Sequence, residues 1–166
     1  MGTGRLIFID GMKEAGTEEV WKEAHPDWTH IVLTSPFDRE KSNKQWNEEI
    51  FSRLEEGKGV VALGSPAGFL SRITGFSCLP PDIWRTLRNV AQLCQSPASY
   101  TLLLLLDPLL AKDRNPDADR EELDREWRDF NLLGAFLPRS QTLDMGKTPV
   151  EEALKTLDAG LGACVK

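Results

Sequence analysis

The alternation of short apolar segments with longer segments of helical periodicity constrains this fold more than any other feature of the sequence. The apolar segments are Leu6–Ile9, Thr29–Leu33, Val60–Leu63, Tyr100–Leu106 and the weaker Gln141–Leu143. Runs that are apolar throughout suit strands buried on both faces, as in parallel sheets. Strands that alternate with helices imply right-handed crossovers. We therefore predict a three-layer α/β fold in which helices flank a five-stranded parallel sheet.

The segments between the predicted strands carry helix signals. Thr17 fits an N-cap, and glutamates follow it in the first turn. Helices are predicted from Thr17, over about 41–56, 82–95 and 120–137, and from Thr148-Pro149 towards Gly160. The tryptophans Trp21, Trp46, Trp84 and Trp127 fall on apolar helix faces, where core packing is expected. The polar stretch of about 107–120 is interpreted as a lid-like segment within a single domain of residues 1–166.

Composition narrows the class of partner. The chain has 166 residues and a formal net charge of -6, which argues against the basic face that nucleic-acid binding usually needs. Its three cysteines form no C-x-x-C pair, so neither a disulfide framework nor a zinc site is indicated. The longest apolar run, Leu102–Leu106, is too short to cross a bilayer, and no signal peptide is visible. We expect a cytoplasmic protein without a membrane partner.

The loop after the first predicted strand is the main candidate for a ligand site. Ligands of parallel α/β sheets bind beyond the carboxyl ends of the strands. Gly11 and Gly16 have the separation of the two glycines in the phosphate-binding pattern G-x-x-x-x-G-K-[ST], between a strand and a helix. However, Thr17 stands at the lysine position and Glu18 at the hydroxyl position. Lys13 supplies a cation from inside the loop, so the segment is either a modified phosphate loop or an ordinary βα turn.

Taken in order, the segments resemble the thymidylate kinase and deoxynucleotide kinase group of P-loop proteins over nearly the whole chain. Leu6–Gly11 resembles that family's first strand and loop entry, and Leu33–Pro36 resembles its second-strand end near the nucleotide substrate. Phe69–Arg72 lies where the family has a substrate-binding stretch. Leu102–Arg114 resembles the strand that leads to the lid, and Asp119-Arg120-Glu121 resembles the lid's Asp-Arg-x-Glu.

This resemblance implies a set of site residues and a ligand class. Lys13, Arg114 and Arg120 would be the catalytic cations, Gly11, Gly16 and Thr17 would bind the cofactor, and Pro36 and Arg72 would contact the substrate. The implied ligand is ATP or another nucleotide with Mg²⁺. Arginines in a lid can neutralise charge on a transferring phosphoryl group.

The departures from the family lie where the chemistry should happen. The loop lysine and hydroxyl are missing, and Gly64-Ser65 stands where the family has an Asp-Arg pair after the third strand. We therefore expect a degenerate kinase-like protein that binds a nucleotide or acts as a regulatory or assembly subunit, with a protein partner or as a homodimer. Two alternatives stay open. One is an active nucleotide or DNA-base kinase in which Lys13 replaces the missing lysine and Asp10 or Glu18 helps to hold magnesium. The other is a purely structural subunit.

Overall fold

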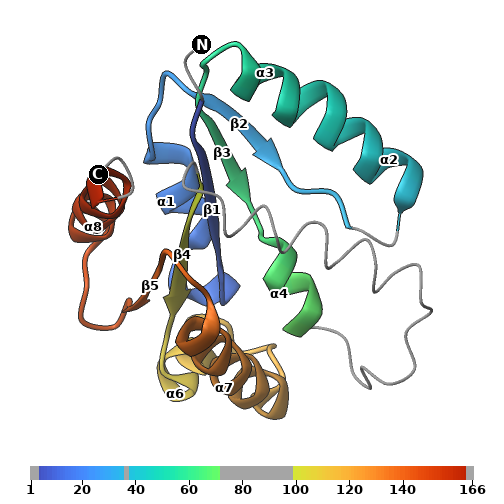
Figure 1. The fold of residues 1–166 in the computed structure, drawn as a ribbon. Helices are drawn as coiled ribbons and strands as arrows, with labels where there is room; N and C mark the ends of the chain where they lie inside the picture. Colours follow the sequence, from blue (N-terminus) through green and yellow to red (C-terminus); the bar gives the residue numbers. More distant parts are fainter. Residues whose placement is uncertain (1–3, 36–37, 72–98, 164–166) are drawn as a thin grey trace.

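Five parallel strands form one sheet at the centre of the molecule (Figure 1). The computed structural model describes residues 4–35, 38–71 and 99–163. The strands are β1 (Leu6–Gly11), β2 (Thr29–Val32), β3 (Val60–Leu63), β4 (Ser99–Leu105) and β5 (Ser140–Asp144). Their spatial order is β2-β3-β1-β4-β5, and every neighbouring pair is parallel. β1 thus lies in the middle of the sheet. The chain adds β2 and β3 on one side of β1 and then β4 and β5 on the other side.

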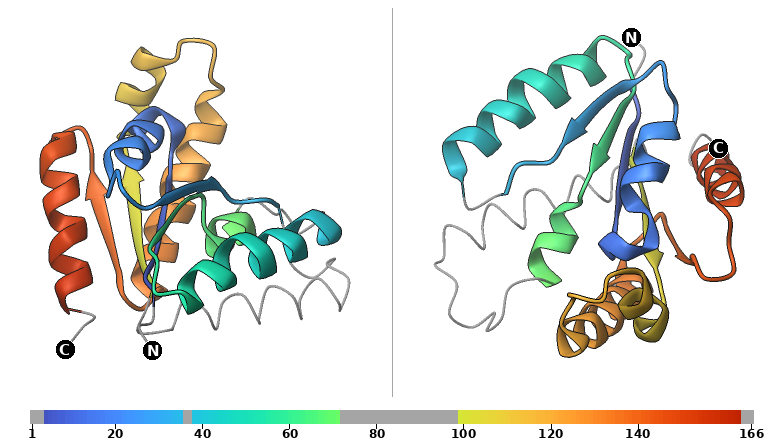
Figure 2. Two further views of the ribbon diagram at one scale, coloured as in Figure 1. Left: turned by 90° about the horizontal axis from the view of Figure 1, so that it is seen from above. Right: turned by 180° about the vertical axis from the view of Figure 1, so that it is seen from behind.

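Helices cover both faces of the sheet (Figure 2). One face carries α1 (Thr17–Glu23) and α8 (Val150–Ala163), which contact each other. The other face carries the continuous helical run of α2 (Arg39–Lys44), π-helical η2 (Gln45–Phe51) and α3 (Ser52–Glu55), followed by α4 (Pro66–Ser71) and α7 (Arg120–Phe136). The short helix α6 (Pro108–Arg114) lies beyond the carboxyl end of β4 (Figure 1).

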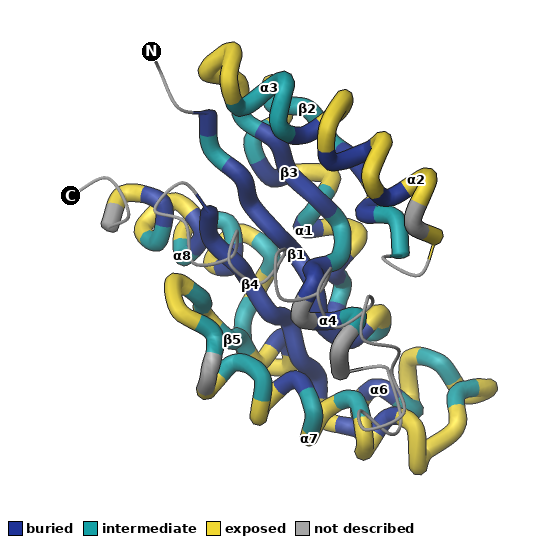
Figure 3. The backbone as a smooth tube through the Cα atoms, turned by 45° about the vertical axis from the view of Figure 1, so that its right-hand side comes forward, coloured by how far each residue is buried: buried dark blue, intermediate teal, exposed yellow. Residues whose placement is uncertain are grey.

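Two close approaches show that α7 and α8 pack on opposite faces. A Cβ on Gly160 of α8 would lie 2.2 Å from the Tyr100 ring, whereas a Cβ on Gly134 of α7 would lie 3.5 Å from the Leu103 side chain. Residues an odd number apart in a strand point to opposite faces. The sheet is therefore enclosed between two helical layers, and β1 and β4 are buried along their whole length (Figure 3).

The predicted fold class is confirmed. All five predicted strands are present within one or two residues of their expected ends, and the helices predicted over 41–56 and 120–137 are observed as 39–55 and 120–136. The helix predicted over 82–95, with Trp84, lies outside the described residues. The fold therefore follows from the alternation of segments in the sequence.

Two local expectations, those for Thr17 and Trp127, were wrong. Gly16, rather than Thr17, is the N-cap of α1, so Thr17 is the first helical residue and is buried. The segment interpreted as lid-like contains helix α6, for which no helix was predicted. The N-cap of α6 is Asp107, whose side chain accepts a hydrogen bond from Leu109 N at 2.9 Å. Trp127 is 42% exposed although it shares the spacing of the buried Leu123. Helical spacing gives the direction of a face, but a neighbouring element must lie over a residue to bury it.

Candidate functional site

The end of β1 leads into a tight turn rather than an open loop. The N–H of Met12 donates to the carbonyl of Leu104 on β4 at 2.9 Å, which extends strand pairing beyond Gly11. The 3-10 helix η1 (Lys13–Ala15) follows at once, and Gly16 closes it in the left-handed conformation with φ 85°. The N–H of Ala15 donates to Met12 O, and the N–H of Gly16 donates to Lys13 O. Two of the N–H groups of this loop are therefore used inside the turn and not by an anion.

Gly11 has a structural reason to be glycine. Its φ is +128°, a conformation that side chains rarely adopt, and a Cβ on it would lie 2.0 Å from the carbonyl oxygen of Leu104. The Leu104 oxygen belongs to the backbone of the buried neighbouring strand β4. The first glycine of the phosphate-loop pattern is therefore needed for the approach of β1 to β4, whatever the loop binds.

Thr17 and Glu18 stand at the positions of the phosphate-loop lysine and hydroxyl. Thr17 is only 8% exposed. Glu18 is exposed and forms an i,i+4 ion pair of 3.9 Å with Lys22. Glu19, also exposed, places Oε2 3.2 Å from the position that a Cβ on Gly16 would take. Carboxylates in the first turn are favoured by the helix dipole, so the protein supplies its own negative charge there.

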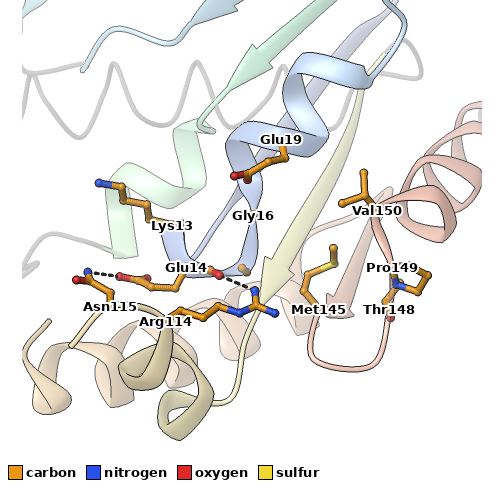
Figure 4. Close-up of a pocket in the computed structure, with 11 residues that line it drawn as sticks. Lys13, Glu14, Gly16, Glu19, Arg114, Asn115, Met145, Thr148, Pro149 and Val150 are labelled. Carbon is orange, nitrogen blue, oxygen red and sulfur yellow. Dashed lines mark hydrogen bonds between the residues drawn. The ribbon is translucent and has the colours of Figure 1, made fainter. Parts of the chain in front are cut away.

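A pocket of about 600 Å³ lies beside this turn, at the carboxyl ends of β1, β4 and β5 (Figure 4). This volume lies within the range of small-molecule sites. The described lining residues come from the turn, α1, the end of α6 and the β5–α8 loop: Lys13, Glu14, Ala15, Gly16, Glu19, Arg114, Asn115, Met145, Thr148, Pro149 and Val150. The pocket therefore combines charged groups on one side with a mainly apolar wall on the other.

Arg114 and Asn115 tie the end of α6 to the β1 turn. Arg114 Nη1 donates to the carbonyl of Glu14 at 3.0 Å, and Asn115 Nδ2 donates to Glu14 Oε1 at 3.2 Å. Figure 4 shows Arg114 between the turn and the wall formed by Met145 and Val150, whereas the Lys13 side chain points away from that wall. Arg114 is therefore the cation nearest to the middle of the pocket.

The turn after α6 is held by its own hydrogen bonds. Lys112 Nζ donates to the carbonyl of Pro116 at 2.6 Å and to that of Ala118. Arg120 begins α7 beyond this turn, pairs with Asp124 at 3.1 Å and does not line the pocket. The two arginines that the sequence placed together in a lid thus have separate surroundings.

A second polar cluster lies between the ends of β1 and β3. Asp10 is 3% exposed, and its Oδ1 accepts a hydrogen bond from Gly11 N at 2.8 Å. Its Oδ2 accepts one from Ser65 Oγ at 2.8 Å, and Ser65 Oγ in turn accepts from Gly68 N at 2.9 Å. Both oxygens of Asp10 are engaged inside the protein, at the point where the strand order reverses.

The structure brings together part of the predicted site. Lys13, Gly16 and Arg114 line the pocket, whereas Gly11 and Thr17 are buried beneath it and Arg120 lies apart. Pro36 and Arg72 lie outside the described residues. Sequence reasoning noted Glu19 as a negative charge in the first turn of the helix but not as a lining residue, and it missed Asn115. Thr148 and Pro149 marked the start of the last helix, after a segment that resembles the adenine-contacting loop of the kinase group.

Two positions that contact Mg²⁺·ATP in a conventional phosphate loop hold other residues in this chain. Among residues 4–35, 38–71 and 99–163, no group of three or more His, Cys, Asp or Glu side chains is arranged to hold a metal ion. The lysine and hydroxyl that would contact the phosphates and the ion are replaced by buried Thr17 and by Glu18. Two cations, Lys13 and Arg114, are nevertheless placed to meet an anionic ligand.

Within the described ranges, none of the helices combines the length and apolar character needed to cross a bilayer.

Comparison with known proteins gives matches among solved structures alone: no family model and no curated protein matches the sequence. Thymidylate kinase from Candida albicans superposes with a TM-score of 0.63 at 13% identity, covering 97% of this chain and 92% of that chain. The YorR protein from Bacillus subtilis, in complex with phosphorylated GDP, gives 0.62 at 17%, covering 93% and 94%. An unliganded sugar kinase from a Janibacter species gives 0.57 at 14%, covering 96% and 95%.

These likenesses extend over nearly the full length of each chain. At identities this low they establish the shared architecture, and function must be argued from the site. The chain therefore has the α/β fold of the P-loop nucleotide kinases, with a five-stranded parallel sheet and helices on both faces.

Proposed function

We propose that this protein binds a nucleotide in the pocket beside the β1 turn and does not carry out conventional ATP-driven phosphoryl transfer. The observation that carries the proposal is that Lys13 and Arg114, from distant segments, line one pocket of about 600 Å³ at the carboxyl ends of the strands. Ligands of open parallel sheets bind at this edge. Binding without turnover is the chemistry of a sensor or of a regulatory subunit.

The contacts of Arg114 support a role in anion binding. A guanidinium has five N–H donors and suits bidentate recognition of phosphate. The bond from Nη1 to the Glu14 carbonyl fixes the Arg114 side chain against the β1 turn, where it lines the pocket. Asn115 fixes the same stretch of chain through its bond to Glu14 Oε1. The cation is therefore positioned before any ligand arrives, which lowers the entropy cost of binding.

The surroundings of α1 support the absence of conventional transfer. A phosphate-loop lysine must reach the β- and γ-phosphates, but Thr17 occupies that position and is buried. Glu18 and Glu19 add two negative charges in the first turn, where the transferred group would lie. Repulsion from these carboxylates opposes the charge that develops on a transferring phosphoryl group.

We expect Arg114→Ala to raise the dissociation constant for the bound nucleotide about tenfold, because it removes a charge-assisted contact. Isothermal titration calorimetry measures this with adenosine, guanosine, cytidine and thymidine nucleotides at low ionic strength. Lys22→Ala is the matched control. It removes a cation of α1 whose partner is Glu18 and which does not line the pocket, so the dissociation constant should change less than about twofold.

Two outcomes would contradict the proposal. One is the absence of binding by any nucleotide at millimolar concentration, which would favour the structural-subunit alternative and a search for a protein partner. The other is equal weakening by Arg114→Ala and Lys22→Ala, which would place the ligand elsewhere.

A second candidate, an active kinase, is favoured by one observation: the exposed Lys13 side chain lines the pocket and stands where it could replace the missing loop lysine. If this candidate is right, phosphate transfer from radiolabelled ATP is measurable and Lys13→Ala lowers kcat at least about a hundredfold. Turnover that survives Lys13→Ala would exclude this role for Lys13. The absence of turnover in the unchanged protein would leave the binding proposal standing.

A further inference from the structure

We propose that His30 is held in its doubly protonated, positively charged form and acts as a pH-sensitive lock on the carboxyl end of helix α1. His30 does not line the candidate nucleotide pocket, so this role does not depend on the proposed function. The two histidines of the chain, His25 and His30, lie in and next to the connection of residues 24–28 between α1 and β2. Histidine is the side chain whose charge ordinarily changes between about pH 5 and 8, so a proton-linked change near neutral pH is expected here.

Both ring nitrogens of His30 face backbone carbonyl oxygens. Nδ1 lies 2.9 Å from Trp28 O, and Nε2 lies 2.8 Å from Ala24 O. A carbonyl oxygen can only accept a hydrogen bond, and a ring nitrogen without a proton can likewise only accept. A neutral imidazole has one such nitrogen, so it would set two acceptors against each other at one of these contacts. Only the imidazolium donates at both, and the fold therefore favours the charged ring.

The Ala24 carbonyl belongs to the carboxyl end of α1. Ala24 is the C-cap of this helix, and the last carbonyls of a helix lack partners inside it. The helix dipole also places partial negative charge at this end, which favours a cation there. Ala24 is buried, so loss of the His30 donor would leave its carbonyl poorly solvated. The charged ring thus satisfies the end of α1 and joins it to β2.

The surroundings of His30 hold its charge through backbone groups. The Trp21 ring of α1 packs against the His30 ring in a T-shaped arrangement, with ring centroids 5.5 Å apart. In the sheet, His30 is paired in register with Val61 of β3. In the part of the chain that the structure describes, no charged side chain forms an ion pair or a hydrogen bond with His30. The two carbonyls, and not a carboxylate, therefore stabilise the imidazolium.

His25 makes a second and weaker contact from the same connection. Its Nε2 lies 2.9 Å from Asp158 Oδ1 of α8, without the alignment of a hydrogen bond. The Asp158 side chain is 67% exposed, so solvent screens the pair and little stability follows from it. The neighbouring carboxylates of Glu23 and Asp27 are exposed as well. The main response of this region to pH is therefore assigned to His30.

The protonation state of His30 is measured by nuclear magnetic resonance on protein that contains nitrogen-labelled histidine, since the ring-nitrogen shifts distinguish neutral from charged rings. We expect both His30 nitrogens to carry protons at about pH 7, where the same residue in the urea-unfolded protein is mainly neutral. His25→Asn assigns the signals, because it leaves His30 as the remaining histidine of the chain. A folded protein in which His30 has a single ring proton at this pH overturns the proposal.

Stability against pH gives the second test. If the folded state holds a proton that the unfolded state releases near neutral pH, stability falls as the pH rises. Between about pH 6 and 8, the unfolding equilibrium constant from urea titrations should rise about five- to tenfold more in the unchanged protein than in His30→Gln, whose side chain stays neutral.

His25→Asn is the matched control, since asparagine tolerates the positive φ of 42° at position 25. It should keep most of the pH dependence, because the pair with Asp158 is exposed. Loss of the pH dependence in His25→Asn together with its retention in His30→Gln would assign the response to the wrong histidine and overturn the proposal. If His30→Gln does not fold, the resonance measurement on the unchanged protein decides.

Discussion

Replacing Gly11 by alanine should lower the free energy of unfolding by about 3 kcal/mol or more. The new Cβ would lie 2.0 Å from Leu104 O and 2.7 Å from Leu104 N, and both atoms belong to the backbone of a fully buried strand. The φ of +128° adds strain for any residue with a side chain. Chemical denaturation followed by tryptophan fluorescence measures the loss.

Gly162→Ala is the control for this substitution. Gly162 lies in α8, and nothing is found within 4 Å of a Cβ on it, so alanine should stabilise the protein by up to about 1 kcal/mol through helix propensity. If Gly11→Ala instead kept full stability and lost nucleotide binding, the glycine would be needed for the ligand and not for the contact between β1 and β4.

Replacing Asp10 by alanine should cost about 2–4 kcal/mol of stability. The substitution removes the acceptor of two buried hydrogen bonds, those donated by Gly11 N and Ser65 Oγ, each 2.8 Å long. Ser65 in turn holds Gly68 N at the start of α4, so the loss reaches the loop after β3. Thermal and urea unfolding of the variant measure the effect.

Asp10→Asn separates a structural role from a metal-binding role. The amide oxygen can still accept from Gly11 N, and the amide N–H can donate to Ser65 Oγ, so most of the stability should be retained. Asp124→Ala, which removes an exposed carboxylate of α7, should change stability by less than about 1 kcal/mol. A protein whose Asp10→Asn variant is stable but has lost a magnesium-dependent activity would show that Asp10 serves as a metal ligand after all.

The candidate site was predictable in part. Gly16 and Lys13 could be found because they lie in one continuous segment with recognisable spacing, and Arg114 came from the order of segments in a known family. Glu19 was recognised as a negative charge in the first turn of α1, but its place in the pocket lining was not predicted. The position of Asn115 and of the Met145 and Val150 side chains in the lining could not be predicted, because only tertiary packing brings them to the β1 turn.

Helix α6 was not predicted, although the sequence contains a helix-start signal for it. Asp107 before Pro108 is an N-cap followed by proline at the first helical position. No helix was predicted there, because the segment is mainly polar. In the structure the turn after α6 is held by Lys112 Nζ, which donates to the carbonyls of Pro116 and Ala118. Trp127 shows the opposite error, since its spacing predicted burial and no described element covers it sufficiently.

The sequence by itself determined the class of fold, the order of strands and helices along the chain, and the presence of Thr17 and Glu18 where a phosphate loop has its lysine and hydroxyl. These are local properties, since periodicity and residue identity can be read along one segment. Tertiary structure decided that Gly11 is required by Leu104, that Asp10 is bound by Ser65 and that Arg114 meets Glu14 across the pocket. Each of these contacts joins residues far apart in the chain, and side-chain direction and sheet order, which no single segment encodes, bring them together.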